Sequence, residues 1–358
     1  MTCTILNVAF PFAPVGQDAV GGAEQILTAL DVAIVKHGWR SIVIACEGSN
    51  TAGTLITTPR IEDQLADETQ RLARSNHKEA IQRALKEFSV DLIHMHGLDF
   101  NRYLPSRGTP VLATLHLPPA WYDPEIFHLY RPLTYINCVS AAQNRACPSN
   151  AVLLPAIENG VAVEQFVTRV RKRNFVVALG RICPEKGFHV AIEAAKLTNI
   201  PLLLAGEVFR YEAHEHYFCN QIIPRLDSRR RFIGPIGFAR KRRLLSAARC
   251  LLVPSLVQET SSLVAMEALA CGTPVVAFPA GALTEIIEHG KTGFLVKDEK
   301  EMAEAIEAAG TLDPDVCREA AQRRFSAGKM ADRYFEIYEQ LIREYRGTVR
   351  ESFVEDKG

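Results

Sequence analysis

The sequence lacks a net charge, since its 41 lysines and arginines equal its 41 aspartates and glutamates. Without a basic excess, the composition gives no support for nucleic acid as the main partner. The sequence also lacks an apolar run of about 18–20 residues and a charged-then-apolar signal at its N-terminus. These absences predict a cytoplasmic protein that does not span a membrane.

Three further patterns are missing. Nine cysteines are spread singly from Cys3 to Cys317 without a CxxC pair, which argues against a disulfide framework or a structural zinc site. The GxGxxG fingerprint is absent from the first loop, so NAD binding has little support. The triplet Asp313-Pro314-Asp315 is predicted to form a turn and helix cap, not a metal site.

What the sequence does contain is an alternation of apolar strands with helices. Strands are predicted at 2–10, 40–46, 91–96, 110–116 and 135–140, and the pattern restarts at 175–181. Near-continuous apolar strands separated by helices indicate α/β domains with parallel sheets. We divide the chain into domains 1–168 and 169–329, followed by an amphipathic helix and tail over 330–358. Ligands of open α/β sheets bind at the carboxyl ends of strands, so residues after strands are the candidate site residues.

Two cations follow the strand at 175–181. Arg181 comes directly after it, and Lys186 precedes Gly187 at the start of a helix, where the helix dipole disfavours positive charge. An anion held by a helix end, a guanidinium and an ammonium would form a diphosphate site. The alternative is a pair of solvated surface cations.

Two glutamates occur in the stretch QETSSLVAMEALACG. A helix is predicted from near Ser261, and the amides of Ser261, Ser262 and Leu263 can bind phosphate oxygens. Glu259 would repel phosphate and instead suits hydroxyl groups. Glu267 lies among apolar residues, where a buried carboxylate needs a partner. Ribose hydroxyls, a buried salt bridge to an arginine or contact with solvent would each satisfy it.

Histidines and basic clusters offer weaker signals. His94, His96 and His116 lie at strand ends and are expected to be hydrogen-bonded cleft or core residues rather than metal ligands. The HEH triplet at 214–216 is predicted to lie on the surface. Basic clusters at 169–173, 229–231 and 240–243 are expected to be solvated, with peripheral contact to anionic lipid as the alternative.

Taken in order, these elements resemble the retaining glycosyltransferases of family 4, which have the GT-B fold of two Rossmann-like domains facing a cleft. The resemblance runs from GGAE at 21–24 to GKTGFLV at 290–296, and it is strongest in LGRICPEKGFHVAIEAA, LLLAGE, FIGPI and CGTPVVAF. It implies transfer of a sugar from a nucleotide-diphosphate sugar, with UDP-glucose as the first guess, to a small-molecule, glycan or lipid-linked acceptor. It further implies that no metal or other cofactor is required and that the C-terminal helix crosses back to the N-terminal domain.

The resemblance also assigns roles to residues of this sequence. Arg181 and Lys186 would hold the diphosphate, Glu259 and His116 would face the reacting sugar, and Glu267 would bind the ribose hydroxyls. Contacts to the remaining donor atoms would come from Gly21, Gly22, Ile236, Thr260, Ser261, Ser262 and Leu263.

One departure concerns the residues after Glu259. The family usually has Gly-Phe-Gly there, whereas this chain has Thr260-Ser261-Ser262, which leaves the donor sugar open. Alternatives to a transferase are a nucleotide-sugar epimerase or hydrolase on the same fold, and a nucleotide-sugar-binding protein without activity.

Overall fold

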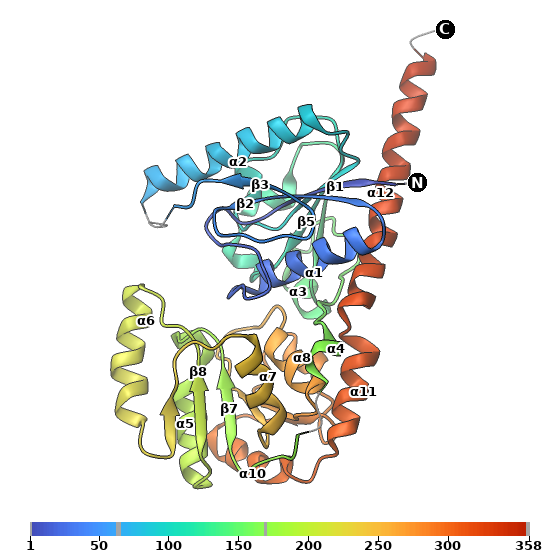
Figure 1. The fold of residues 1–358 in the computed structure, drawn as a ribbon. Helices are drawn as coiled ribbons and strands as arrows, with labels where there is room; N and C mark the ends of the chain where they lie inside the picture. The colour runs from blue at the N-terminus through green and yellow to red at the C-terminus, as the bar shows by residue number, and fades with distance from the viewer. Residues whose placement is uncertain (1, 62–65, 168–169, 356–358) are drawn as a thin grey trace. The chain divides into compact units, whose positions relative to one another are not determined.

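The structure is a computed structural model that describes residues 2–61, 66–167 and 170–355, with side chains described as far as residue 347. The chain forms two compact units (Figure 1). Unit 1 comprises Met1–Asn159 together with Ala327–Gly358, and unit 2 comprises Gly160–Ser326. The domain boundary predicted between residues 168 and 169 falls on residues outside the described ranges.

Unit 1 is built on a six-stranded parallel sheet in the order β3-β2-β1-β4-β5-β6, the Rossmann order. In register, Ile5 of the central strand pairs with Ser41 on one side and Leu92 on the other. The strands are β1 (Thr4–Val8), β2 (Arg40–Cys46), β3 (Thr54–Thr58), β4 (Leu92–Met95), β5 (Val111–Leu115) and β6 (Thr134–Cys138). The edge strand β3 was not predicted, because its sequence TLITT has no apolar run.

Helices cover both faces of this sheet because successive strand residues face opposite ways. Ile42 and Ile44 pack with α2 (Asp67–Glu87), whereas Val43 and Ala45 pack with α1 (Gly22–Lys36). The last helix, α12 (Ala327–Glu355), contacts α1 and β4 of unit 1. This agrees with the prediction that the C-terminal helix crosses back to the N-terminal domain. The helix continues to Glu355, and so takes up most of the segment 330–358 predicted as a helix and tail.

Unit 2 repeats this design. Its parallel sheet has the order β12-β11-β10-β7-β8-β9, which is the same Rossmann order counted from β7. The strands are β7 (Val176–Leu179), β8 (Leu202–Ala205), β9 (Arg230–Phe232), β10 (Leu251–Val253), β11 (Val275–Ala277) and β12 (Gly293–Leu295). The prediction of two parallel α/β sheets is therefore confirmed.

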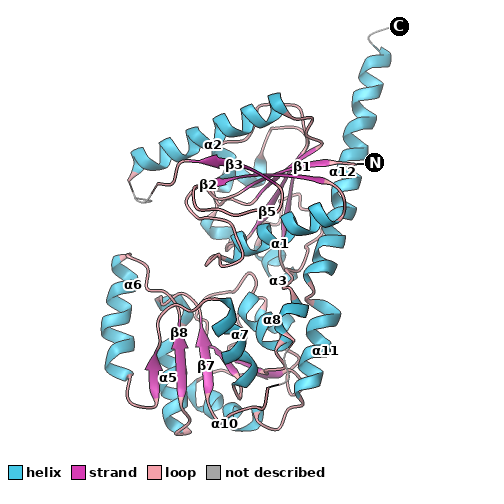
Figure 2. Cartoon of the chain, in the orientation of Figure 1, coloured by secondary structure: helices cyan, strands magenta, loops and turns pink. Residues whose placement is uncertain are grey.

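Two helix layers sandwich the second sheet (Figure 2). Val176 and Ala178 face the core that contains α5 (Phe188–Leu197) and α10 (Glu299–Ala309). Val177 faces the core that contains α8 (Leu263–Ala270) and α11 (Pro314–Arg324). The other helices are α3 (Ala141–Ala146), α4 (Val163–Phe166), α6 (Glu212–Tyr217), α7 (Phe238–Ala247) and α9 (Leu283–Ile286). Within the described ranges, none of the helices is both long and apolar enough to cross a lipid bilayer.

Candidate active site

The segment after β7 carries both predicted cations. Arg181 is exposed and has no salt bridge within the described residues, while Lys186 ends a short helical turn. Gly187 follows with φ 61°, and a Cβ on it would lie 2.2 Å from the Pro254 carbonyl oxygen. Glycine is needed here for both its left-handed conformation and its close approach to the loop after β10.

Glu259 joins three loops of unit 2. Its Oε1 accepts a hydrogen bond from Lys186 Nζ at 2.6 Å and another from Ser255 Oγ. Its carbonyl oxygen accepts from the Ala282 amide at 2.8 Å. Because Glu259 is only 9% exposed, this ion pair is largely shielded from solvent. The structure thus brings together Lys186 and Glu259, two predicted site residues that are 73 positions apart.

Helix α8 begins two residues later than predicted, at Leu263 instead of near Ser261. Its first amides, those of Leu263 and Val264, belong to the helix positions that lack intrahelical acceptors. Ser262 is the N-cap residue but makes no side-chain cap. The Oγ of Ser261 is buried and has no hydrogen-bond partner. The TSS segment therefore presents an unpaired hydroxyl at the start of the helix.

Glu267 has an ionic partner. It is 4% exposed, and its Oε1 accepts a hydrogen bond from Lys241 Nζ of α7 at 2.5 Å. Burial raises the pKa of Glu267, and Lys241 opposes that shift. The side chain therefore makes the buried salt bridge that the sequence left as an alternative, but to a lysine rather than an arginine. That lysine belongs to the cluster 240–243, whose side chains were expected to be solvated.

Ile236 lies between β9 and α7. It is half-buried and packs against the core to which α8 contributes. Gly234, two residues earlier, has φ 70° and turns the chain after β9.

In unit 1, Gly21 is the N-cap of α1, and Gly22 is its first residue. A Cβ on Gly21 would lie 1.9 Å from Oε2 of Glu24, so glycine leaves room for that carboxylate. Glu24 is itself buried, and the sequence did not identify it as a site residue. Its sequence signals are its place in the GGAE motif at 21–24 and its position in the first turn of a helix, where a carboxylate is favourable.

His116 follows β5 directly and is 8% exposed. Its Nε2 lies 3.0 Å from His96 Nδ1, and burial lowers the pKa of His116 to about 3. Burial also holds the pKa of His96 well below its ordinary value, so both rings are neutral near pH 7. His94 is bonded to Tyr338 Oη at 2.6 Å and Thr114 Oγ1 at 2.7 Å, which confirms a hydrogen-bonded core residue.

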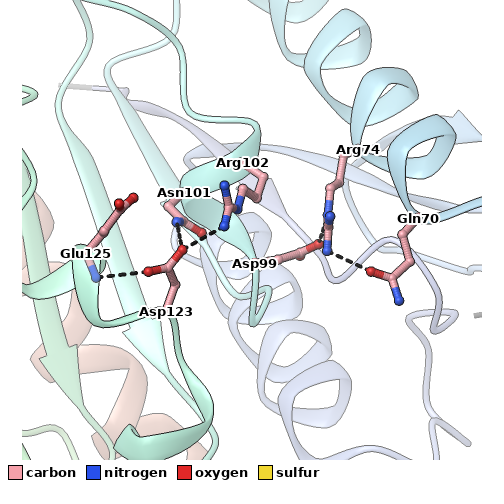
Figure 3. A network of polar contacts seen from close by, with 7 residues as sticks. All are labelled: Gln70, Arg74, Asp99, Asn101, Arg102, Asp123 and Glu125. Atoms are coloured by element: carbon pink, nitrogen blue, oxygen red, sulfur yellow. Dashed lines mark hydrogen bonds and ion pairs between the residues drawn. The ribbon is translucent and has the colours of Figure 1, made fainter. Parts of the chain in front are cut away.

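Ion pairs join the loop after β4 to α2 and to the loop after β5 (Figure 3). Arg74 of α2 pairs with Asp99 at 2.7 Å, and Arg102 pairs with Asp123 at 2.8 Å. Trp121, two residues before Asp123, is 50% exposed. All four charged residues lie in the segments 47–77 and 99–132, which the sequence predicts to form the wall of the acceptor site.

His214 corrects a prediction. The HEH triplet was expected on the surface, but His214 is only 9% exposed, whereas His216 is exposed. The reason is α6, which turns His214 and Tyr217 inward at helical spacing. One ring nitrogen of His214 comes within 4.8 Å of Cys183 Sγ and of a Glu185 oxygen.

Comparisons with known proteins agree with this architecture. The profile of the family described as glycosyl transferases group 1 matches residues 173–310. Phosphatidyl-myo-inositol mannosyltransferase of Mycobacterium leprae (strain TN) is 30% identical over 305 residues, which cover 73% of this chain and 76% of that protein. The protein of the same name from Mycobacterium tuberculosis (strain CDC 1551 / Oshkosh) is 30% identical over 225 residues. That match spans only about half, 56%, of the relative's length.

Solved structures share the fold over nearly the whole chain. Sucrose-phosphate synthase from Thermosynechococcus elongatus has a TM-score of 0.77 at 22% identity, covering 96% of this chain and all of that one (100%). Anabaena Alr3699/HepE in complex with UDP-glucose has a TM-score of 0.71 at 20% identity, covering 94% and 99%. These likenesses confirm the GT-B fold. Together with the Mycobacterium leprae relative, they lead to one conclusion: the chain belongs to the group 1 glycosyltransferase family.

Proposed function

We propose that the protein transfers a sugar from a nucleotide-diphosphate sugar to an acceptor, with retention of anomeric configuration and without a catalytic metal ion. The observation that carries this proposal is the buried pair of Lys186 and Glu259, with exposed Arg181 in the same segment as the lysine. Arg181 makes no salt bridge within the described residues, so its guanidinium can attract a diphosphate, with Lys186 held beside it by Glu259. This arrangement favours the diphosphate site over two solvated cations.

In the proposed reaction, the bond between the anomeric carbon and the diphosphate oxygen breaks as a bond to the acceptor oxygen forms. The acceptor attacks from the side of the leaving group, and its proton passes to a phosphate oxygen. Arg181, Lys186 and the first amides of α8 stabilise the negative charge that develops on the diphosphate. Glu259 holds hydroxyl groups of the donor sugar.

Other donor contacts follow from the predicted roles. Ser261 offers its unpaired hydroxyl to the donor, together with Thr260, Ser262 and Leu263. Glu267 binds ribose hydroxyls while keeping its bond to Lys241, because a carboxylate accepts several hydrogen bonds. Ile236 borders the base. For unit 1, the contributions of Gly21, Gly22 and His116 remain predictions.

The donor and acceptor classes are proposed from the names of similar proteins. UDP-glucose is the first donor to test, since the Anabaena neighbour has a complex with it. The Mycobacterium relatives are named phosphatidyl-myo-inositol mannosyltransferases, which supports including a mannose donor and inositol-containing acceptors. We retain a cytoplasmic location and peripheral contact of basic residues with lipid as part of the proposal.

The test is a thermal-shift and calorimetric screen of nucleotide sugars, followed by mass spectrometry of products with an acceptor panel. We expect a glycosylated acceptor whose anomer, determined by NMR, matches that of the donor, and turnover that survives EDTA. Arg181→Ala should abolish the thermal shift by the donor. An isomerised donor or free sugar without acceptor would indicate an epimerase or hydrolase. Donor binding without any product across the panel would indicate a binding protein.

A further inference from the structure

Unit 2 contains a cluster of three potential metal ligands. Cys183 and Glu185 lie on either side of Pro184 in the turn after β7, and His214 lies in α6. One ligand atom from each residue lies within 4.8 Å of the other two. Cys183 is 2% exposed, His214 is 9% exposed and Glu185 is half-buried, so the cluster lies mostly below the surface.

His214 is the residue that points to a ligand. Its Nδ1 is buried and makes no hydrogen bond. The ring is held by edge contacts with Phe209 and Tyr211, whose centroids lie 6.3 and 5.1 Å away. A buried polar atom without a partner is unfavourable and uncommon in native proteins.

We propose that Cys183, Glu185 and His214 bind one divalent cation of the zinc class. A thiolate, an imidazole and a carboxylate suit zinc or cobalt rather than magnesium or calcium, which prefer oxygen ligands alone. Bond lengths of about 2.0–2.3 Å place ligand atoms roughly 3.4–3.6 Å apart around a tetrahedral ion. The distances between ligand atoms therefore need to shorten by at most about 1.2–1.4 Å. The Cys183 thiol loses its proton to solvent on binding, and the fourth position stays open.

A surface pocket lies next to this cluster in the chain. The pocket is lined by Pro184, Glu212, Ala213, His216, Tyr217 and Gln221. Pro184 separates Cys183 from Glu185, and Ala213 precedes His214, so the pocket adjoins the cluster. The bound ion would tie the segment that carries Arg181 and Lys186 to α6. The proposal rests on the three ligands alone and stands independently of the proposed transferase reaction.

The test is titration of the chelator-stripped full chain with Co²⁺, followed by competition with Zn²⁺ in a calorimeter. We expect one ion per chain, a sulfur-to-cobalt charge-transfer band and a Zn²⁺-dependent rise in Tm. Cys183→Ala and His214→Ala should weaken binding at least about 100-fold, because loss of outer partners alone weakens metal sites 10–100-fold. Glu185→Gln, at a half-buried position, provides a variant that preserves shape and should also weaken binding.

Two variants serve as matched controls. His216→Ala removes an exposed histidine from the same helix, and Cys219→Ala removes an exposed thiol five residues beyond His214. Both should bind as the unaltered chain does. Circular dichroism of the ion-free variants separates misfolding from ligand loss. A charge-transfer band that persists in Cys183→Ala, equal weakening in His216→Ala, or failure of the folded chain to bind either ion would overturn the proposal.

Discussion

The two units share one strand order but bury different polar groups. Unit 1 buries a cluster of neutral histidine rings, with His96 bonded to His116 and His94 bonded to Tyr338 and Thr114, and carries ion pairs on its loops. Unit 2 buries two glutamates against lysines, Glu259 against Lys186 and Glu267 against Lys241. Both sets are buried, so burial alone does not determine whether a group is charged.

The difference follows from the available partners. A buried histidine without a carboxylate beside it sheds its proton, because desolvation penalises the charged form. A buried glutamate stays ionised when a lysine lies within hydrogen-bonding distance. Unit 1 therefore buries hydrogen-bonded neutral rings, whereas unit 2 buries carboxylates that lysines keep ionised. Four predictions test this contrast, from the largest expected effect to the smallest.

Acid should destabilise unit 1 first. Burial lowers the pKa of His77 to about 4 and of His116 to about 3, and it holds those of His94 and His96 well below 6.5. Below pH 6.5 the unfolded chain therefore binds more protons than the folded chain. The free energy of unfolding should accordingly decrease as the pH is lowered. Each histidine contributes a slope of about 1.4 kcal/mol per pH unit, down to its folded pKa.

The measurement is urea unfolding between pH 7.5 and 5. Both tryptophans, Trp39 and Trp121, lie in unit 1, so their fluorescence follows that unit, while circular dichroism follows both. His128→Ala removes an exposed histidine and should leave the slope unchanged. A fluorescence transition that is independent of pH would contradict the assignment of neutral buried rings.

Lys186→Ala should abolish most activity. Loss of one preorganised electrostatic donor costs about 2.7–4 kcal/mol of barrier, or roughly 10²–10³ in kcat. The comparison is with Lys241→Ala. Its lysine pairs with Glu267, which we propose binds the ribose, so this substitution should affect KM more than kcat. Steady-state kinetics with the donor identified by screening provides the measurement. Lys291→Ala, at an exposed ion pair, is the control. Equal kcat for Lys186→Ala and Lys291→Ala would remove Lys186 from the reaction.

Lys241→Ala should also destabilise unit 2, because it leaves the buried Glu267 carboxylate without its partner. We expect a loss of about 1–3 kcal/mol at neutral pH. Without the lysine, burial alone raises the pKa of Glu267, so the loss should shrink as pH falls and the carboxyl protonates. Urea unfolding followed by circular dichroism measures it, with exposed Arg243→Ala as the control on the same helix. A loss that does not vary with pH would show that the ion pair is not its source.

Ser261→Ala should produce the smallest effect. Its hydroxyl has no partner in the protein, so stability should change by less than about 0.5 kcal/mol. If the hydroxyl binds donor, the Kd for the donor should rise by a factor corresponding to about 0.5–1.5 kcal/mol. Calorimetry measures this difference, and Ser49→Ala in unit 1 is the control serine. An unchanged Kd would mean that Ser261 does not select the donor.

The sequence predicted some site features better than others. Lys186 and Glu259 were singled out separately, from their positions after strands, and the structure joins them. Lys241 was missed as a partner of Glu267, because its arginine-rich surroundings are typical of a solvated helix face. His214 was misplaced because a short helix of mixed polarity has no strong apolar period. Glu24 was missed since one carboxylate in a first helix turn is common.

The sequence by itself determined the two parallel sheets, because apolar runs and helical spacing are local patterns that every such fold must satisfy. It also determined which residues follow the strands, and hence the candidate list for the donor site. Only the tertiary structure decided the partners: Lys186 with Glu259, Lys241 with Glu267, and Cys183 with Glu185 and His214. Such pairings depend on how helices pack over a sheet, and the free energy of a buried charge depends on the group that packing places beside it.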